Sequence, residues 1–251
     1  MAGKDRKKQL ARQRYERQQQ ALAQAAAKAR RAKIIGAGVA VAVVVVGGAA
    51  IVVYTGKDGE SKADGPHCAY IPEGQPAGKV KSLGTPPKKP AYKGTVQATV
   101  KTDQGDVVMQ LDAKAAPCTV NSFAYLAQKN FYDDSPCHRL TSGGLNVLQC
   151  GDPAGTGMGG PGYRFANENT ANAKYTAGTL AMAHSSQPDS NGSQFFMVYK
   201  DSQLDPDYSV FGKITKGLDI LEKIAKAGST PAEDGKPKKK VTIQDVTIAP
   251  V

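Results

Sequence analysis

The chain has 251 residues, of which 40% are hydrophobic and 22% charged, a balance too apolar for a wholly disordered protein. A net charge of +11 would suit a nucleic-acid partner if it were spread over the chain. Instead, residues 1–33 carry 11 Lys and Arg against only Asp5 and Glu16, and the rest of the chain is close to neutral. The composition therefore excludes a globally basic nucleic-acid-binding protein and predicts one folded domain with appended segments.

A run of 20 residues, Ile34 to Val53, consists only of Ile, Val, Ala and Gly. Because about 20 apolar residues in a helix span the ~30 Å hydrocarbon core of a bilayer, we predict a transmembrane helix over residues 34–54. A buried core helix and a cleaved signal peptide are the alternatives. The lack of any polar side chain in the run disfavours the first, and the length of the run and the absence of a small-residue cleavage site disfavour the second.

The basic residues before this run indicate its orientation, because Lys and Arg near a span hold that side in the cytoplasm. The four residues concerned are Lys28, Arg30, Arg31 and Lys33. We therefore expect residues 1–33 to form a basic cytoplasmic segment that lies on anionic lipid rather than on RNA. The C-terminal part should lie outside the cell membrane, which the chain would cross once.

Residues 55–93 are rich in Gly and Lys and contain six Pro. X-Pro pairs favour extended backbone, and a segment of this composition buries little apolar surface. We predict a tether that holds the following domain, residues 94–251, away from the membrane.

Short alternating segments predominate after Gly94 and indicate strands. Apolar and polar residues alternate over Thr95–Thr102, Asp106–Leu111 and Val241–Ala249. Helical spacing is found in Pro117–Gln128, which begins with Pro, and in Leu218–Ala227, which Gly228 follows. Many strands with only two helices predict a mainly β domain, either a barrel or a sandwich.

All four Cys follow the apolar run, on the side where disulfides persist, and four Cys allow three pairings. Cys137 and Cys150 flank Gly143-Gly144, so a hairpin centred there favours this pair and leaves Cys68 to bond with Cys118. Four free buried thiols are the alternative.

Motifs for metal, cofactor or nucleophilic chemistry are weak. The three His and four Cys lack metal-ligand spacing. The G-x-G-x-x-G match at residues 155–160 is followed by Pro161, where a dinucleotide-binding fold needs a helix. No G-x-S-x-G elbow is present, and the sequon Asn191-Gly192-Ser193 is interpreted as a tight turn. We therefore expect no metal and no cofactor.

Arginine usage points to one position. After residue 33 the chain has 20 Lys and only two Arg, Arg139 and Arg164. A planar, permanently charged fork is what Lys cannot supply, so Arg139, which lies within a predicted strand, is a candidate functional residue. Phe195 and Phe196 are adjacent in another strand, so one ring should face the core and the other is available to line a shallow pocket.

Taken together, the segments after Gly94 resemble the cyclophilin family of peptidyl-prolyl cis-trans isomerases, in order to Val251. The segments that carry the resemblance are Pro117–Phe123, Cys137–Leu140, Val147–Asp152, Gly155–Gly162, Phe165 with Glu168-Asn169, Gly178–Ala183, Asn191–Phe196 and Val210–Lys213. The resemblance implies an eight-stranded antiparallel β-barrel capped by two helices. The predicted anchor and tether look like those of bacterial single-pass members of the family.

The resemblance also implies a substrate site. Arg139 is similar to the family's catalytic arginine, and Gln149 to the glutamine beside it. The implied walls of a proline pocket are Phe196, Val147 and Leu204. Further substrate contacts are implied for Gln194, Ala183, His184 and Tyr208.

Three positions depart from the family pattern. Asn146 stands where an aromatic is expected, so one pocket wall would be missing or would come from a shifted loop. Gln203 replaces a tryptophan, which implies weak cyclosporin binding, and Tyr208 replaces a histidine.

The implied site also conflicts with the favoured disulfide. A register that places Arg139 opposite Gln149 is centred on residue 144, whereas a Cys137–Cys150 pair is centred between residues 143 and 144. Since one residue of slip moves side chains to the other face of a sheet, either a bulge separates the two pairs or the disulfide is wrong.

The implied chemistry breaks no bond. Rotation about an amide has a barrier of about 18 to 20 kcal/mol, and a donor such as Arg139 would favour the twisted state in which the proline nitrogen regains its lone pair. The leading hypothesis is a monomeric, membrane-anchored isomerase that acts on proline-containing polypeptides among exported proteins, with no nucleic-acid partner. The alternatives are a catalytically weak module or chaperone that binds proline-containing segments, and a lipid- or RNA-associated scaffold that works through residues 1–33.

Overall fold

The computed structural model describes residues 42–46, 49–53, 66–81 and 83–249. The chain divides into two compact units, Met1–Ala63 and Asp64–Val251. The predicted basic segment, residues 1–33, and the first part of the predicted membrane span lie outside the described residues.

The described part of the first unit is a short β-hairpin. β1 (Ala42–Val46) pairs antiparallel with β2 (Ala49–Val53). This corrects the transmembrane helix predicted over residues 34–54, because the backbone is extended wherever that segment is described. Val and Ile favour strands, and an apolar run does not by itself distinguish a helix from a strand. Among the described residues, no helix combines the length and apolar character needed to cross a membrane.

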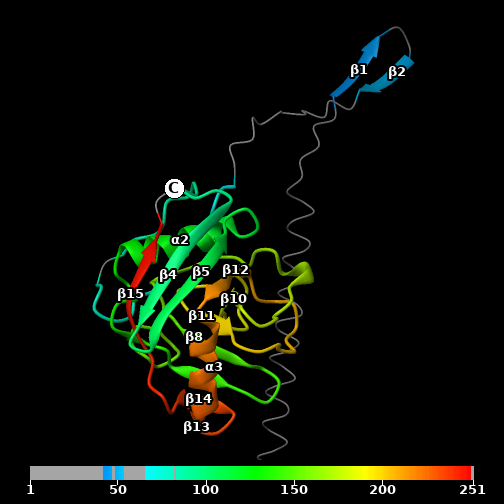
Figure 1. The fold of residues 1–251 in the computed structure, drawn as a ribbon. Helices are drawn as coiled ribbons and strands as arrows, with labels where there is room; N and C mark the ends of the chain where they lie inside the picture. The colour runs from blue at the N-terminus through cyan, green and yellow to red at the C-terminus, as the bar shows by residue number, and fades with distance from the viewer. Residues whose placement is uncertain (1–41, 47–48, 54–65, 82, 250–251) are drawn as a thin grey trace, which may run out of the picture. The chain divides into compact units, whose positions relative to one another are not determined.

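The second unit is built on a curled antiparallel sheet of 11 strands (Figure 1), which confirms the predicted mainly β class. The strand order is β13-β14-β7-β8-β11-β10-β12-β5-β4-β15-β6. The strands are β4 (Thr95–Thr102), β5 (Gly105–Asp112), β6 (Ser135–Pro136), β7 (Arg139–Thr141), β8 (Val147–Cys150), β10 (Thr179–Met182), β11 (Phe195–Val198), β12 (Val210–Lys216), β13 (Ser229–Thr230), β14 (Asp234–Pro237) and β15 (Thr242–Ile248). A separate two-stranded ladder pairs β3 (Ile71–Pro72) with β9 (Tyr163–Arg164).

The chain itself links two distant parts of this sheet. β6 lies at one edge and pairs with β15, whereas β7, which begins three residues after β6 ends, pairs with β8. β6 and β7 therefore behave as one strand that is interrupted at Cys137-His138. Counted in this way, the described sheet has the eight strands that the resemblance implies, and the β13–β14 hairpin is an addition to them.

Burial alternates along the first hairpin, as its sequence pattern predicts. Val96 and Val100 of β4 face the core, while their neighbours in the strand are more exposed. The fully buried aromatic rings of the core include those of Phe123, Phe195 and Phe211. The rings of Phe195 and Phe211 both contact Phe123 from the first helix, so this helix is fixed to the sheet by aromatic packing.

Both predicted helices are confirmed. α2 (Pro117–Gln128) begins with Pro and packs against β15 and β5. α3 (Leu218–Ala227) packs against β14 and β5 and ends at Gly228, whose φ of 79° suits a glycine. Figure 1 shows α2 and α3 near opposite ends of the sheet. A short 3-10 helix, Thr170–Asn172, follows β9.

The start of α2 is capped from a distant part of the chain. Ala116, which precedes the helix, provides no side-chain cap. Instead, the carboxylate of Glu168 accepts hydrogen bonds from the backbone N–H groups of Cys118 and Thr119, at 3.0 and 2.8 Å. A negative charge is favourable at a helix N-terminus, so Glu168 fixes the loop before the 3-10 helix onto α2.

Residues 66–93, which we call the strap, pack onto the sheet and correct the extended tether predicted over residues 55–93. The buried side chains of the strap include those of Cys68, Tyr70, Leu83 and Tyr92. Cys68 is bonded to Cys118 at the start of α2, and β3 of the strap pairs with β9. Extended backbone, which Pro favours, is also the conformation that pairs with a strand, so Pro content did not exclude packing. The folded unit therefore begins before the predicted boundary at residue 94.

Both favoured disulfides are present, and the predicted conflict of register is resolved by an irregular backbone. Cys137 is bonded to Cys150 with 4.0 Å between their Cα atoms, while Arg139 lies opposite Gln149 in the β7–β8 ladder. Cys137 lies in the interruption between β6 and β7, where its N–H donates to the carbonyl of Val241. The interruption supplies the one-residue offset that lets the disulfide and the Arg139–Gln149 pair coexist.

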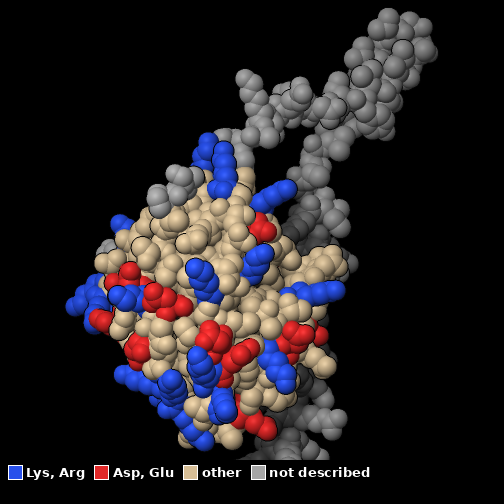
Figure 2. Space-filling model, viewed as in Figure 1, with Lys and Arg blue, Asp and Glu red and all other residues tan. Residues whose placement is uncertain are grey.

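Basic and acidic side chains are interspersed over the face of the second unit that Figure 2 shows. This agrees with the nearly neutral composition of the chain after residue 33.

Candidate functional site

A small apolar pocket lies where β8, β10 and β11 are neighbours in the sheet. Its volume is about 100 Å³, the scale of one small ring, since a cavity of about 150 Å³ holds benzene. It is lined by Arg139, Leu145, Val147, Gln149, Ala183, His184, Phe196, Leu204 and Tyr208. The pocket thus brings together eight of the nine site residues predicted from the sequence, and the ninth, Gln194, bonds to Gln149.

The apolar wall depends on the alternation of side chains in β11. Phe195 points into the main core, whereas Phe196 belongs to a second, smaller cluster with Val147, Tyr175 and Ala181. The two adjacent rings therefore serve opposite faces of the strand, as predicted. Phe196 is 4% exposed, which makes it a firm wall of the pocket.

Arg139 is held in place by a carboxylate from a neighbouring strand that is distant in the sequence. Its Nε and Nη2 atoms donate to the two oxygens of Asp234 at 2.7 and 2.8 Å, and β14, which carries Asp234, pairs with β7. The hydrogen bonds from Arg139 lower the pKa of Asp234, and the same bonds raise the pKa of Arg139. Burial lowers the pKa of the adjacent His138, so its ring is neutral at pH 7 and adds no second positive charge.

A chain of amide hydrogen bonds extends from Arg139 along the sheet. Arg139 Nη1 donates to Gln149 Oε1 at 3.2 Å, and Gln149 Nε2 donates to Gln194 Oε1 at 2.9 Å. Gln194 Nε2 in turn donates to the carbonyls of Gly157 and Gly159, at 3.0 and 2.9 Å. These bonds fix which end of each amide faces the pocket.

The glycine-rich loop at the end of this chain is itself organised by a buried carboxylate. Asp152 accepts hydrogen bonds from the backbone N–H groups of Ala154, Thr156, Gly157 and Gly159. Burial opposes the charge, but these bonds outweigh it and lower the pKa of Asp152. The backbone N–H groups of this glycine-rich loop therefore bind the carboxylate of Asp152. The sequence had already argued against a dinucleotide at this loop. Within the described residues, no group of three or more His, Cys, Asp or Glu is placed to hold a metal ion.

The structure also identifies site residues that the sequence did not. Leu145 supplies the pocket wall expected at Asn146, whose buried side chain donates to the carbonyl of Asp201 instead. Leu145 of this loop thus takes the place of the missing aromatic side chain. The alternation of Leu145 with Val147 in the sequence could have indicated that both line the pocket. Asp234 gave no local signal, since it lies 95 residues from Arg139. Gln203 is exposed and does not line the pocket.

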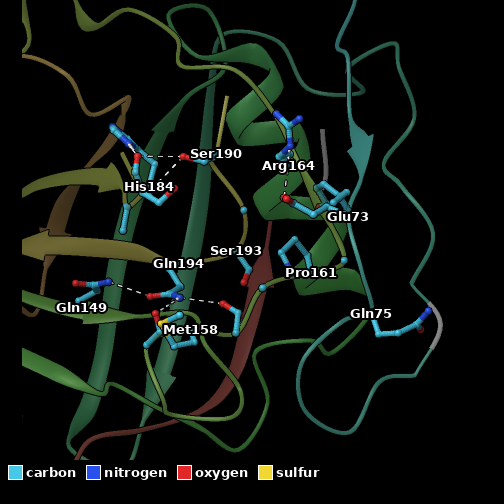
Figure 3. A pocket seen from close by; sticks show the side chains of 18 residues that line it. Glu73, Gln75, Gln149, Met158, Pro161, Arg164, His184, Ser190, Ser193 and Gln194 are labelled. Atoms are coloured by element: carbon cyan, nitrogen blue, oxygen red, sulfur yellow. Dashed lines mark hydrogen bonds and ion pairs between the residues drawn. The ribbon is translucent and has the colours of Figure 1, made fainter. Parts of the chain in front are cut away.

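A larger cavity of about 440 Å³ adjoins the apolar pocket and shares Gln149, Ala183 and His184 with it. Figure 3 shows its floor at Gln149 and Gln194, with Met158 nearby and His184 and Ser190 on another side. The strap contributes Glu73 and Gln75 to its wall. A ligand chain that places one small ring in the apolar pocket can therefore continue directly into this cavity.

Comparison with known proteins agrees with the fold. The family described as "Cyclophilin type peptidyl-prolyl cis-trans isomerase/CLD" matches residues 97–248. A "Probable peptidyl-prolyl cis-trans isomerase B" of Mycobacterium tuberculosis is 47% identical over 199 residues, which is 73% of this chain and 64% of that protein. This chain therefore spans about two thirds of the length of that relative.

Solved structures show the same relationship. A crystal structure of a cyclophilin type peptidyl-prolyl cis-trans isomerase of Cryptosporidium parvum superposes with a TM-score of 0.56 at 30% identity, covering 62% of this chain and 99% of that one. A second crystal structure of that protein, in the presence of the dipeptide Ala-Pro, gives a TM-score of 0.55 at 32% identity over the same shares. The chain belongs to the cyclophilin-type peptidyl-prolyl cis-trans isomerase family.

Proposed function

We propose that this chain is a peptidyl-prolyl cis-trans isomerase that accelerates rotation of Xaa-Pro bonds in polypeptide clients. The observation that carries the proposal is a guanidinium, Arg139, oriented by Asp234 at the edge of a ring-sized apolar pocket. Two further facts support it: membership of the isomerase family, and a crystal structure of a relative that was obtained in the presence of the dipeptide Ala-Pro.

In the proposed mechanism the protein binds the twisted amide more tightly than either planar form. Phe196, Val147 and Leu204 hold the proline ring while the preceding carbonyl turns. Arg139 has five N–H groups, of which Asp234 and Gln149 use three, so an N–H on each Nη remains for the nitrogen that loses conjugation. Gln149 is fixed by Gln194 and is placed to bond with the turning carbonyl side.

The function is tested by a protease-coupled assay of the full-length protein on acetyl-Ala-Ala-Pro-Phe-p-nitroanilide. The uncatalysed reaction takes tens to hundreds of seconds, and the protein should shorten this time in proportion to its concentration. Binding of the peptide without any acceleration would contradict the enzyme and would instead favour a module that captures proline-containing segments.

We further propose that the clients are exported proteins and that the enzyme works outside the cytoplasm. The two disulfides support this, because such bonds persist in oxidising compartments. A peptide map under non-reducing conditions, made on protein from its native cell, should contain both cross-links. Four reduced thiols in that map would contradict the assignment.

Asp234 is proposed as a positioning residue, and its effect should depend on pH. Asp234→Asn keeps the shape but loses the charge, so kcat/KM should fall about threefold, as for a partly exposed ion pair. Because Arg139 lowers the pKa of Asp234 below its usual 3.8, the orienting charge is present at neutral pH and is lost only as pH falls through that lowered value. Titration of Asp234 should therefore cause no change in the kcat/KM of the native protein between about pH 5 and 8.

NMR exchange spectroscopy measures this profile without a protease. At strongly acidic pH the native protein should lose activity towards the level of Asp234→Asn, and the variant should show no matching decline. A variant with native kcat/KM throughout would show that Asp234 does not position Arg139. Asp219→Asn, on the exposed face of α3, is the matched control and should change nothing.

A further inference from the structure

The strap adds a charged wall to the cavity beside the proline pocket. The family match begins at residue 97, so Glu73 and Gln75 lie outside it, yet both line the 440 Å³ cavity. The Glu73 side chain is 66% exposed and faces Arg164, with 3.5 Å between its Oε2 and the Nε of Arg164 (Figure 3). A charge that the family match does not include therefore borders the path of the client.

The position of Glu73 is fixed by several independent contacts. Its N–H donates to the carbonyl of Gly162 at 2.8 Å, next to the β3–β9 ladder. Tyr70, three residues earlier, is buried against the rings of Tyr163 and Phe165 and donates to the carbonyl of Cys118 at 2.8 Å. Together with the Cys68–Cys118 disulfide, these contacts make the strap a rigid support for the carboxylate.

Arg164 has more hydrogen-bond partners at this wall than the carboxylate of Glu73 has. Arg164 Nη1 donates to the carbonyls of Pro188 and Asp189, at 3.4 and 3.3 Å, and its side chain is only 31% exposed. Within the described part of the chain, no hydrogen bond is made to the carboxylate of Glu73, whose contact with Arg164 is a loose ion pair. The accessible group is thus an acceptor with negative charge.

An apolar surface borders the same cavity. Met158, in the glycine-rich loop, is 89% exposed, although large apolar side chains are mostly buried in the described residues. A flexible thioether suits varied apolar partners. An aliphatic stem that ends in a cation matches a cavity with both an exposed thioether and an open carboxylate, and Lys and Arg are the side chains with that form.

We propose, on the basis of the isomerase function above, that Glu73 makes the enzyme prefer clients with Lys or Arg two residues before the proline. Two extended residues reach about 7 Å, which leads from the apolar pocket across its shared wall into the cavity. Because Glu73 is exposed and Arg164 is close, the preference is modest. Its expected size is about threefold in kcat/KM for Lys over Glu at that position, as for an exposed ion pair.

The test compares acetyl-Xaa-Ala-Pro-Phe-p-nitroanilide peptides, in which Xaa is Lys, Ala or Glu, on the full-length protein at low ionic strength. The native protein should favour Lys over Glu, Glu73→Gln should bring the ratio near one, and Glu73→Lys should invert it. In about 1 M salt the native ratio should also approach one, because charges are then screened within about 3 Å. Glu222→Gln, which also removes an exposed negative charge but on α3, is the control and should keep the native ratio.

The Ala peptide separates this proposal from the isomerase function. If the native protein does not accelerate the Ala peptide, the isomerase function itself fails. If the Ala peptide is accelerated but the native protein treats Lys and Glu alike, or if Glu73→Gln retains the native ratio, the role of Glu73 is wrong. Similar rates on the Ala peptide for all variants show that each has folded.

Discussion

Replacement of Arg139 by alanine is expected to lower kcat/KM for acetyl-Ala-Ala-Pro-Phe-p-nitroanilide by about tenfold or more, which equals about 1.4 kcal/mol of transition-state stabilisation. The reason is that this guanidinium is the charged donor at the apolar pocket, and Asp234 holds it there through two hydrogen bonds. Arg139→Lys should restore little, because an ammonium cannot reproduce the planar fork that binds Asp234 and still offers donors to a substrate. The protease-coupled assay gives all three rates.

The controls separate catalysis from folding. Because Arg139 is partly exposed, both substitutions should leave the fold intact. Near-ultraviolet circular dichroism of the protein's tyrosines should therefore be native in both variants. Lys213→Ala, an exposed position on β12, also removes one positive charge and should keep the native rate. Equal rates for Arg139→Ala and the native protein would remove the catalytic role of Arg139.

The strap disulfide is expected to have the largest effect on stability. Removing it with the double substitution Cys68→Ser and Cys118→Ser should lower the free energy of unfolding by about 4 kcal/mol, because the bond closes a loop of 50 residues. The Cys137–Cys150 bond closes a loop of only 13 residues, so its removal should cost about 3 kcal/mol. Urea unfolding, followed by tyrosine dichroism because the chain has no Trp, measures both.

The strap disulfide is also predicted to act on selectivity more than on rate. Its loss should leave kcat/KM for the Ala peptide within about twofold, since the disulfide lies outside the apolar pocket. The Lys over Glu preference should decrease, because Glu73 loses one of its supports. An unchanged unfolding midpoint would show that the strap is held by its packing alone.

Local patterns in the sequence were sufficient for both helices of the second unit and for three of its strands, but not for the β13–β14 hairpin or the β3–β9 ladder. Alternation over Thr95–Thr102 and the proline at the start of Pro117–Gln128 depend on interactions within a few residues, and both elements appear as predicted. The helix predicted from the apolar run before Tyr54 was wrong, because an apolar composition suits both a helix and a strand. The β-branched residues of the run favour a strand. The tether predicted over residues 66–93 was wrong, because Pro indicates extended backbone but does not indicate whether that backbone pairs with another strand.

The site was predictable where the resemblance supplied residues and not where it lacked them. Arg139, Gln149 and Phe196 lie in motifs of the family and come together in one pocket. Asp234 and Glu73 could not be found, because each reaches the site through strand pairing between segments far apart in the sequence. The expected monomer stays a prediction.

The packing of the strap means that the family match and the folded second unit do not have the same length. The family match begins at residue 97, but the ring of Tyr70 makes T-shaped contacts with the rings of Tyr163 and Phe165, and Cys68 is bonded to Cys118. A protein shortened to residues 97–248 would uncover the rings of Tyr163 and Phe165 and would leave Cys118 as an unpaired thiol. Because exposed apolar patches and free thiols favour self-association and cross-linking between molecules, we expect residues 66–93 to protect the second unit from both.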